Sequence, residues 1–290
     1  MSLESQQHPL LMTADELAEA LERGEAPIVI DCQASLADPA AGHRAWMSAH
    51  VPGAAHADLE TDLSAPRTEH SGRHPLPDPE VFAQSARLWG VSRERTVVAY
   101  DDSNGAFATR CWWLFRWLGH PDVRILDGGF AAWRRAGHPT EAGGVAAGRG
   151  NFRPAPASMP TVSADFLQAG LASGELSLLD ARAASRFQGR EEPIDPVAGH
   201  VPGAVNAPFA ENVDEQGYWR APEALAARYR ERLPDRDPRS VVHMCGSGVT
   251  ACHNLFAMEL AGLRGSALYP GSWSEWIRDP QRPVARDDGG

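Results

Sequence analysis

One order of motifs occurs twice along this chain, and the repetition constrains the fold more than any other feature. In each copy an apolar stretch ending in aspartate precedes a His-Val-Pro-Gly-Ala segment, a second apolar stretch and a glycine-aromatic turn. The paired segments are 30–31 with 179–180, 50–54 with 200–204, 97–100 with 241–244, and 128–133 with 271–276. The chain is therefore expected to hold two copies of one folding unit.

Within each copy, short apolar runs alternate with stretches of helical periodicity. Residues 27–32 predict a buried strand, 96–100 another strand, and 123–130 a strand that leaves into a turn, whereas 13–22 and 106–118 predict helices. Strand and helix in alternation predict an α/β fold with two tandem domains, each a parallel β-sheet flanked by helices on both faces.

The boundary between the copies is predicted from composition. A stretch rich in glycine, alanine and proline, at 141–160, reads as a linker. The expected domains are accordingly 1–140 and 161–290.

Composition also excludes several classes of function. The net charge of −11 argues against nucleic acid and anionic membranes as partners. No apolar run reaches transmembrane length and the first residues do not resemble a signal peptide, so we expect a cytoplasmic protein. All 27 basic residues are arginine, which excludes a Schiff-base lysine and a Walker-type phosphate loop.

The four cysteines are too few for a disulfide framework and form no C-x-x-C pair, as expected of reduced thiols in a cytosol. Cys245, Cys252 and His253 do not have the spacing of a zinc site, so no metal is expected.

Cys245 lies at a predicted strand-to-helix turn, between a strand at 240–244 and a helix at 251–263. Amide N–H groups converge at such a turn and stabilise negative charge, which favours a thiolate. Gly246 and Gly248 would let the backbone fold around the sulfur with dihedrals that other residues resist. The alternative is that Cys245 is a small buried apolar side chain, as free cysteines commonly are.

Three motifs together resemble the rhodanese superfamily, in the form typical of 3-mercaptopyruvate sulfurtransferases. They are CGSGVTA at 245–251, GHVPGAVNAPF at 199–209 and GSWSEW at 271–276. The resemblance implies two rhodanese-like domains and a catalytic Cys245 that carries sulfur as a persulfide. It also implies that the substrate contacts the loop residues Gly246, Ser247, Gly248, Val249 and Thr250. The position matching Cys245 in the first copy is Asp101, so the first domain is expected to be non-catalytic.

The resemblance assigns the anionic end of the substrate to Arg186, in its Arg-Phe-x-Gly motif. A guanidinium fork binds a carboxylate bidentately, which fits that role. The alternative is a solvated arginine-rich turn paired with Glu191 and Glu192, a description that suits Arg182 better than Arg186. Some relatives carry a second arginine nine residues after the first, where this chain has Asp195, and Arg190 is the candidate replacement.

Members of the superfamily have also been ascribed a serine-histidine-acid arrangement. Its matches here are Ser247, His74 and, in the place of an aspartate, Glu60. Ser247 is suited to donate a hydrogen bond to a carbonyl oxygen that develops enolate charge. His74 is otherwise a histidine in a surface loop.

These residues predict a sulfurtransferase without cofactor or metal. Cys245 would take a sulfane sulfur from 3-mercaptopyruvate, release pyruvate, and pass the sulfur to cyanide, a small thiol or a thioredoxin-like protein. A thiosulfate sulfurtransferase is the alternative, although that group carries basic residues where Gly246 and Ser247 stand. A phosphatase of related fold is excluded because it needs an arginine at position 251, which is alanine here. A non-catalytic sulfur-binding module is a further alternative, which the intact cysteine loop disfavours.

Overall fold

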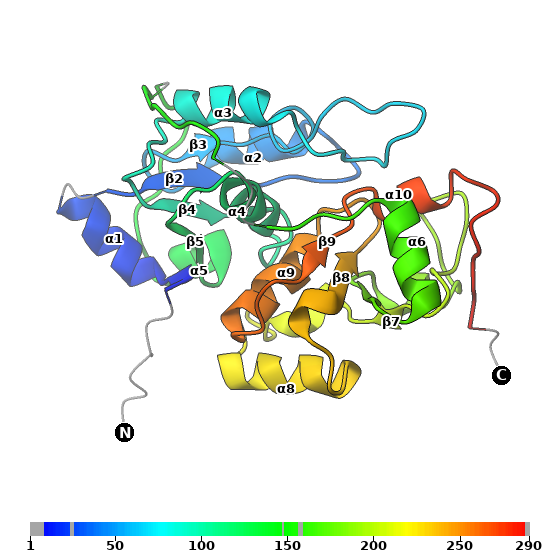
Figure 1. Cartoon of the computed structure of the whole chain (residues 1–290). Coiled ribbons are helices and arrows are strands. Elements are labelled where there is room, and N and C mark those ends of the chain that lie inside the picture. The colour runs from blue at the N-terminus through cyan, green and yellow to red at the C-terminus, as the bar shows by residue number, and fades with distance from the viewer. Residues whose placement is uncertain (1–8, 24–25, 147, 156–158, 288–290) are drawn as a thin grey trace. The chain divides into compact units, whose positions relative to one another are not determined.

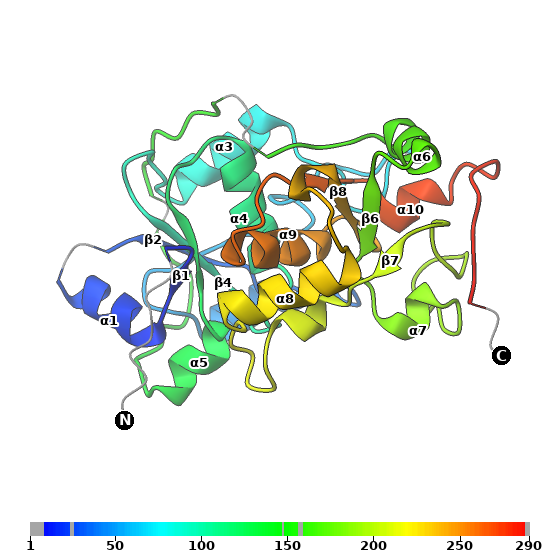
Figure 2. The ribbon, with the colours of Figure 1, turned by 60° about the horizontal axis from the view of Figure 1, so that its bottom comes forward.

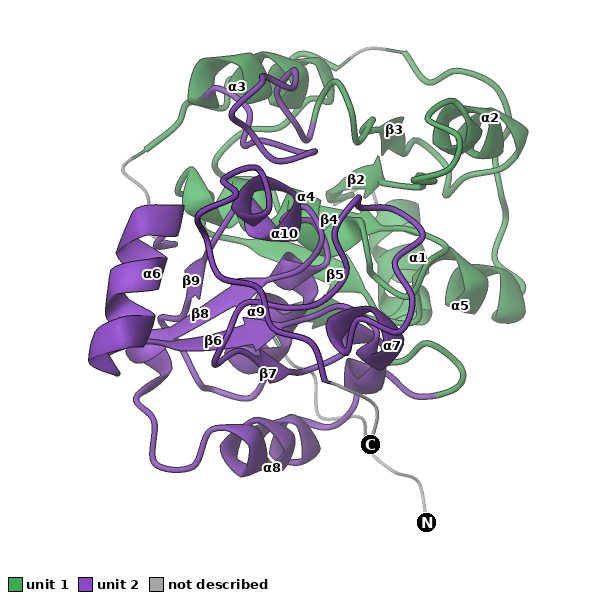
Figure 3. Ribbon diagram, turned by 90° about the vertical axis from the view of Figure 1, so that its right-hand side faces the viewer, with its two compact units in different colours: residues 1–62, 79–156, 215–219 green, residues 63–78, 157–214, 220–290 purple. Residues whose placement is uncertain are grey.

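The computed structural model describes residues 9–23, 26–146, 148–155 and 159–287. Two compact units divide the chain, unit 1 with residues 1–62, 79–156 and 215–219, and unit 2 with residues 63–78, 157–214 and 220–290 (Figure 3). Each unit thus includes a short segment from the other half of the sequence. The domain boundaries predicted from composition remain a prediction. They assign residues 63–78 and 215–219 to the other half of the chain.

Unit 1 is built on a five-stranded parallel sheet with the strand order β1-β5-β4-β2-β3 (Figure 1). Its elements are β1 (Leu11–Met12), α1 (Ala14–Glu22), β2 (Ile28–Asp31), α2 (Ala41–Ser48), β3 (Ala55–His56), α3 (Pro79–Leu88), β4 (Val97–Tyr100), α4 (Ala108–Trp117), β5 (Val123–Leu126) and α5 (Gly129–Arg135).

Helices cover both faces of this sheet. Leu17 of α1 and Trp133 of α5 belong to one buried cluster with Val98 of β4. On the other face lies α4, whose Phe115 packs edge-on against Phe82 of α3 with ring centroids 4.9 Å apart. Apolar burial on both faces explains why the strands read as continuous apolar runs rather than alternating ones.

Unit 2 contains a four-stranded parallel sheet with the order β7-β6-β8-β9 (Figure 2). Its elements are α6 (Ala164–Ser173), β6 (Ser177–Asp180), α7 (Ala184–Phe187), β7 (Val205–Asn206), the 3-10 turn η1 (Phe209–Asn212), α8 (Pro222–Arg232), the 3-10 turn η2 (Pro238–Ser240), β8 (Val241–Met244), α9 (Ala251–Leu260), β9 (Ala267–Leu268) and α10 (Ser272–Trp276).

This second sheet is also covered on both faces. Leu167 of α6 and Trp273 of α10 share one buried cluster with Val242 of β8. Helix α9 packs on β8 and β9 and is itself covered by α8. The predicted α/β fold, with parallel sheets between two helical layers, is confirmed.

Several predicted boundaries move by a few residues. The helix predicted to reach residue 263 ends at Leu260, because Gly262 takes a left-handed φ of 73° and the Leu263 N–H bonds back to the Met258 carbonyl at 2.8 Å. Within the predicted strand and turn at 123–130, the strand ends at Leu126, and the left-handed Gly128 is the N-cap residue of α5. No helix within the described residues is long and apolar enough to cross a membrane.

The predicted linker at 141–160 is not detached along its described part. Glu141 exchanges backbone hydrogen bonds with His50, and the Asn151 and Ala155 N–H groups bond to carbonyls of Val91 and Leu118, all within unit 1. This stretch up to residue 155 therefore extends along unit 1.

In each sheet, two neighbouring four-residue strands end in register. Asp31 pairs with Tyr100 in unit 1, and Asp180 pairs with Met244 in unit 2. The residues that follow β4 and β8 are Asp101 and Cys245. Both therefore lie at the carboxyl edge of a parallel sheet, where open α/β folds bind their ligands.

Candidate active site around Cys245

Strand β8 ends at Met244 and delivers Cys245 into the turn that precedes α9. The cysteine is 2% exposed. Its Sγ accepts a hydrogen bond from the Gly248 N–H at 3.2 Å. The sulfur is thus buried, as expected of a small apolar side chain. It also accepts a hydrogen bond from a backbone amide, as expected of a turn that stabilises a thiolate.

Gly248 has the dihedral that the turn needs. Its φ of 80° lies in the left-handed region, and a Cβ there would lie 2.3 Å from the Pro270 carbonyl oxygen. The prediction that Gly246 needs a backbone dihedral that other residues resist is wrong, because its φ is not in the left-handed region. Gly246 instead leaves room for a neighbour, because a Cβ would lie 2.7 Å from Nη2 of Arg73.

The segment before and within α10 fixes the cysteine loop from the opposite side. Ser272 accepts the Cys245 N–H at 3.1 Å through its hydroxyl, which itself donates to the Tyr269 carbonyl at 3.0 Å. The N–H groups of Trp273 and Ser274 donate to the carbonyls of Cys245 and Gly246 at 3.0 and 2.9 Å. The glycine-aromatic motif thus works as a backbone clamp on the loop.

Ser272 itself is a residue that sequence reasoning missed. Its φ of 53° is left-handed, although it is not a glycine. Backbone strain of this kind is retained where the surroundings enforce it, here by the two hydrogen bonds of its hydroxyl. The sequence signal that leads to it is its place in the GSWSEW motif.

The structure brings Ser247 and His74 together. The Ser247 Oγ lies 2.7 Å from the His74 Nδ1, and the two residues are 4% and 2% exposed. His74 reaches this position because residues 63–78 belong to unit 2, in a loop closed by the Ala65 N–H on the Pro75 carbonyl at 3.0 Å. Glu60, the third member of the predicted arrangement, belongs to unit 1, so its part remains a prediction.

Arg186 stands at the end of α7 among acidic groups. Its Nε and Nη2 donate to Glu192 at 3.0 and 2.7 Å, and Nη2 also donates to Asp195 at 3.1 Å. Of the two glutamates in the alternative interpretation, Glu192 is the one that pairs. Burial acts to raise the pKa of Glu192, but the hydrogen bonds from Arg186 hold that pKa below its usual range.

Asp195 accepts from a second arginine that sequence reasoning did not single out. Arg73, immediately before His74, forms an ion pair with the Asp195 Oδ1 through its Nη1. The pKa of Asp195 is raised, mainly by burial and further by the charge of Glu192, against the opposing pull of the Arg73 and Arg186 charges. A sequence signal did exist in the adjacency of Arg73 to the predicted site histidine.

The two other arginines of the segment take different positions. Arg182 is buried, donates to Asp180 at 2.7 Å and to the Gly199 carbonyl at 2.8 Å, and lies over the Trp273 ring. Its contacts are those of a structural ion pair. Arg190 is exposed.

The remaining loop residues join the cysteine turn to α9. Val249 is 3% exposed, and Thr250 is the N-cap residue of α9. One turn further on, the Cys252 thiol donates to the Gly248 carbonyl at 3.4 Å. Cys252 thus packs under the loop that carries Cys245.

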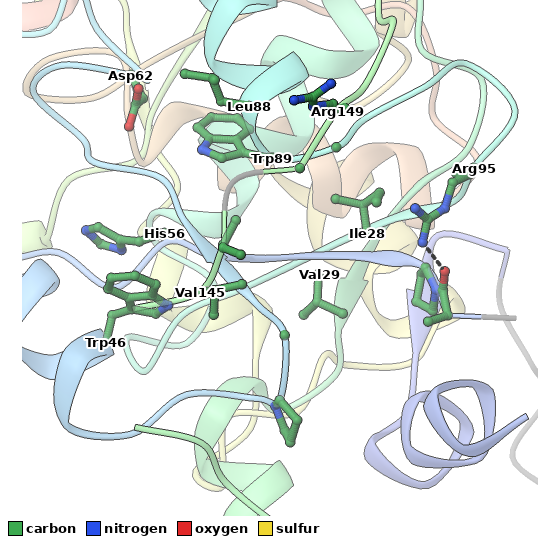
Figure 4. Close-up of a pocket in the computed structure, with 18 of the residues that line it drawn as sticks. Ile28, Val29, Trp46, His56, Asp62, Leu88, Trp89, Arg95, Val145 and Arg149 are labelled. Carbon is green, nitrogen blue, oxygen red and sulfur yellow. Dashed lines mark hydrogen bonds between the residues drawn. The ribbon is translucent and has the colours of Figure 1, made fainter. Parts of the chain in front are cut away.

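A separate pocket of about 760 Å³ lies in unit 1 (Figure 4). Trp46, His56 and Trp89 line it, and at one end Arg95 donates to the Ala26 carbonyl at 2.6 Å. None of the site residues predicted from the sequence is among its lining residues.

The relation of this site to known proteins follows from sequence comparison. The family model for the rhodanese-like domain matches residues 13–136 and again residues 163–279. The chain belongs to the rhodanese-like family. The predicted tandem arrangement of two rhodanese-like copies is confirmed.

Relatives in this family match nearly the whole chain. A probable 3-mercaptopyruvate sulfurtransferase of Pseudomonas aeruginosa is 50% identical over 96% of this chain and 98% of its own length. A putative thiosulfate sulfurtransferase of Mycobacterium tuberculosis is 40% identical over 96% and 97%. The solved structure of 3-mercaptopyruvate sulfurtransferase from Leishmania major has a TM-score of 0.83 and 30% identity, covering 95% of this chain and 77% of that one.

The first rhodanese-like copy contains the same kind of turn with a carboxylate in place of the thiol. The Asp101 Oδ1 accepts the N–H groups of Ser103 and Gly105 at 2.7 and 2.9 Å. Its Oδ2 accepts those of Phe107 and Ala108, both at 2.8 Å. The four bonds show that the backbone N–H groups of the turn after β4 converge on a carboxyl group that the chain itself supplies.

Proposed function

We propose that the protein is a sulfurtransferase that uses Cys245 to take sulfur from 3-mercaptopyruvate, with release of pyruvate. The names of the relatives agree with the sulfurtransferase predicted from sequence, and the relative at 50% identity is named for mercaptopyruvate. The observation that carries the proposal is the pairing of Ser247 with His74 at 2.7 Å, two residues along the loop from Cys245.

That pair explains how an enolate leaving group is accommodated. Cleavage of the carbon–sulfur bond of mercaptopyruvate leaves the electron pair on the carbon, conjugated with the keto oxygen. A hydroxyl aimed at that oxygen stabilises the charge as it develops, and the imidazole orients the hydroxyl. Thiosulfate has no keto oxygen, so a Ser–His pair of this kind offers it nothing equivalent.

The reaction then proceeds in two half-reactions. The Cys245 thiolate attacks the mercaptopyruvate sulfur, a new S–S bond forms, and the C–S bond breaks toward carbon. The enolate takes up a proton to give pyruvate, and Cys245 remains as a persulfide held by the Gly248 N–H. An acceptor thiolate or cyanide next takes the outer sulfur and restores the Cys245 thiolate, which gives ping-pong kinetics.

The charge balance around the loop favours a singly charged donor. Arg73 and Arg186 contribute two positive charges beside Gly246, and Glu192 with Asp195 contribute two negative ones, so the formal charges cancel. A dianion such as thiosulfate would need excess positive charge at this point. We expect mercaptopyruvate to exceed thiosulfate by at least about tenfold in kcat/KM, which corresponds to about 1.4 kcal/mol.

The acceptor and the compartment belong to the same proposal. We propose a small thiol or a thioredoxin-like protein as acceptor, with no nucleic acid or membrane partner. All four cysteines are buried, and no disulfide joins any of them within the described residues, as suits a reducing cytoplasm.

The test measures initial rates with mercaptopyruvate and with thiosulfate against one common acceptor, and the mass of the intact protein after exposure to donor alone. Wild-type protein should gain one sulfur. The adduct should be absent from Cys245→Ser and present in Cys252→Ser, the matched control, because serine can donate to the same Gly248 carbonyl. A sulfur adduct on Cys245→Ser would refute the assignment of Cys245. Thiosulfate turnover equal to that of mercaptopyruvate would refute the proposed donor.

A further inference from the structure

Unit 1 contains a pocket that the proposed sulfur transfer does not use (Figure 4). Residues of α2, β2, β3 and the end of α3 line it, together with residues 145, 146, 148 and 149. Its volume of about 760 Å³ lies within the range of sites that bind small organic molecules. All of its lining residues belong to unit 1, so its chemistry is separate from that of the cysteine loop.

One side of the pocket is aromatic and uncharged. Trp46 of α2 and His56 of β3 are stacked, with ring centroids 5.6 Å apart and an interplanar angle of 20°. Only 7% of the His56 side chain is exposed, and burial lowers the pKa of this histidine, which keeps the ring neutral near neutral pH. The stacked pair therefore offers a flat apolar surface to an aromatic ring.

The opposite side of the pocket is also apolar. Trp89, the residue after α3, lies across the pocket from Trp46 (Figure 4). Its ring makes edge-on contacts with Phe82 and Phe115, at centroid distances of 6.0 and 6.3 Å. Ile28 of β2 adds aliphatic surface and is 8% exposed. An aromatic ligand would thus meet apolar side chains on both sides and from the sheet.

Two carboxylates also line the pocket, but the chain itself uses both as hydrogen-bond acceptors. The Asp58 Oδ1 accepts the N–H groups of Glu60 and Thr61 at 2.8 and 2.9 Å. The Asp62 Oδ2 accepts the Asp58 N–H at 2.9 Å, and its Oδ1 accepts the Ser85 hydroxyl at 2.7 Å. These bonds stabilise the turn at 58–62, so the two carboxylates serve the local fold rather than a cationic ligand.

Two arginines beside the pocket, in contrast, form no ion pair within the described part of the chain. The first is Arg95, which is exposed and whose Nη2 donates to the Ala26 carbonyl at 2.6 Å. This bond fixes the guanidinium at the end of the pocket away from Asp62 (Figure 4). The Nε and Nη1 groups of Arg95 remain able to donate to an anion.

The second arginine is Arg149, which is also exposed. Its neighbours Gly148 and Gly150 donate through their N–H groups to the carbonyls of Leu88 and Arg87, at 2.6 and 2.8 Å. The backbone of Arg149 is therefore held against the end of α3, at the pocket. Because the chain has a net charge of −11, an anion can approach only where such cations lie unpaired.

We propose that the pocket of unit 1 binds an aromatic carboxylate. The aromatic ring lies between Trp46 and Trp89, and the carboxylate is held by the cations of Arg95 and Arg149. This inference does not depend on the proposed sulfur transfer, because no residue of the cysteine loop takes part in it.

The experiment measures binding of 2-naphthoate to the full-length protein by isothermal titration calorimetry. Its uncharged analogue 2-naphthamide has the same rings without the carboxylate. The variants are Arg95→Ala, Arg149→Ala and the double variant. Arg93→Ala is the matched control, because Arg93 is exposed and lies two residues from Arg95 but does not line the pocket. Arg186→Ala reports binding of the probe at the sulfurtransferase site instead.

We expect one 2-naphthoate to bind per chain. Each single variant should weaken this binding roughly threefold and the double variant roughly tenfold, since exposed charge pairs contribute modestly. Arg93→Ala and Arg186→Ala should bind 2-naphthoate as the wild type does. Added salt should weaken the binding of 2-naphthoate but not that of 2-naphthamide.

Binding of 2-naphthamide should be the same in all of these proteins, which would show that the pocket stays folded without its arginines. The inference would be overturned by a wild-type protein that does not bind 2-naphthoate, or by a double variant that binds it unchanged. Equal losses for the acid and the amide, or loss of 2-naphthoate binding in Arg186→Ala, would overturn it as well.

Discussion

Gly246 and Gly248 stand two residues apart in the cysteine loop, yet alanine at position 248 should lower stability, whereas alanine at position 246 should impair catalysis. Gly248→Ala places a Cβ on a residue with φ of 80°, 2.3 Å from the Pro270 carbonyl oxygen. The left-handed backbone costs an L-residue about 1–2 kcal/mol, and overpacking against backbone adds about 1–3 kcal/mol. The expected destabilisation is therefore about 2–5 kcal/mol.

Gly246→Ala meets a different obstacle. The nearest atom to its Cβ is Nη2 of Arg73, at 2.7 Å, which is the far end of a flexible side chain. Arg73 can move away, so the free energy of unfolding should change by less than about 1 kcal/mol, helped by the lower entropy of the unfolded chain. The cost should appear in catalysis instead, as a higher KM for mercaptopyruvate.

Urea unfolding and amide hydrogen exchange over residues 241–276 measure the first effect, and steady-state kinetics with mercaptopyruvate measure the second. Gly248→Ala should lose exchange protection in this segment together with its activity, whereas Gly246→Ala should keep protection and lose affinity. A Gly248→Ala protein as stable as wild type, or a Gly246→Ala protein with unchanged KM and reduced stability, would refute the reasoning.

Two further predictions follow from buried groups. His74→Ala and Ser247→Ala should each lower kcat by about a hundredfold or more. The double variant should be little worse than either single variant, because the two residues act as one unit. Additive losses in the steady-state kcat values would contradict this prediction. Burial raises the pKa of Asp31 to about 6, so the folded protein holds this proton more tightly than the unfolded chain and loses stability as pH rises from about 4 to 6. Urea unfolding at each pH should show the free energy of unfolding of the wild type falling by about 3 kcal/mol across that range relative to Asp31→Asn. Parallel pH profiles of the two proteins would rule out this role of Asp31.

Periodicity and repetition were sufficient to predict the fold, because buried parallel strands and their covering helices leave a strong local pattern. The position of Cys245 in the turn between a strand and a helix could be predicted as well, since the strand, the cysteine and the glycines are contiguous in the sequence. The position of His74 beside Ser247 depended on the family resemblance, because a loop of irregular sequence carries it into unit 2.

Arg73 and Ser272 illustrate what local sequence does not contain. The environment of Arg73 is set by Asp195, 122 positions along the chain, and no spacing rule connects the two. The strained φ of Ser272 is enforced by hydrogen bonds to Cys245 and Tyr269, which exist only in the folded unit. Both depend on tertiary contacts rather than on propensity.

The carboxylate of Asp101 gives the duplicated turn a different thermodynamic status in each copy. In the first copy the carboxylate is covalently part of the chain, so its four amide hydrogen bonds form once, on folding. In the second copy, under the proposed mechanism, the group held by the turn is a sulfur that changes chemically during turnover. The strength of the Gly248 contact must therefore vary through the catalytic cycle. The first copy thus holds its turn through a group fixed in the chain, whereas the proposed mechanism links the stability of the second turn to the sulfur that it carries.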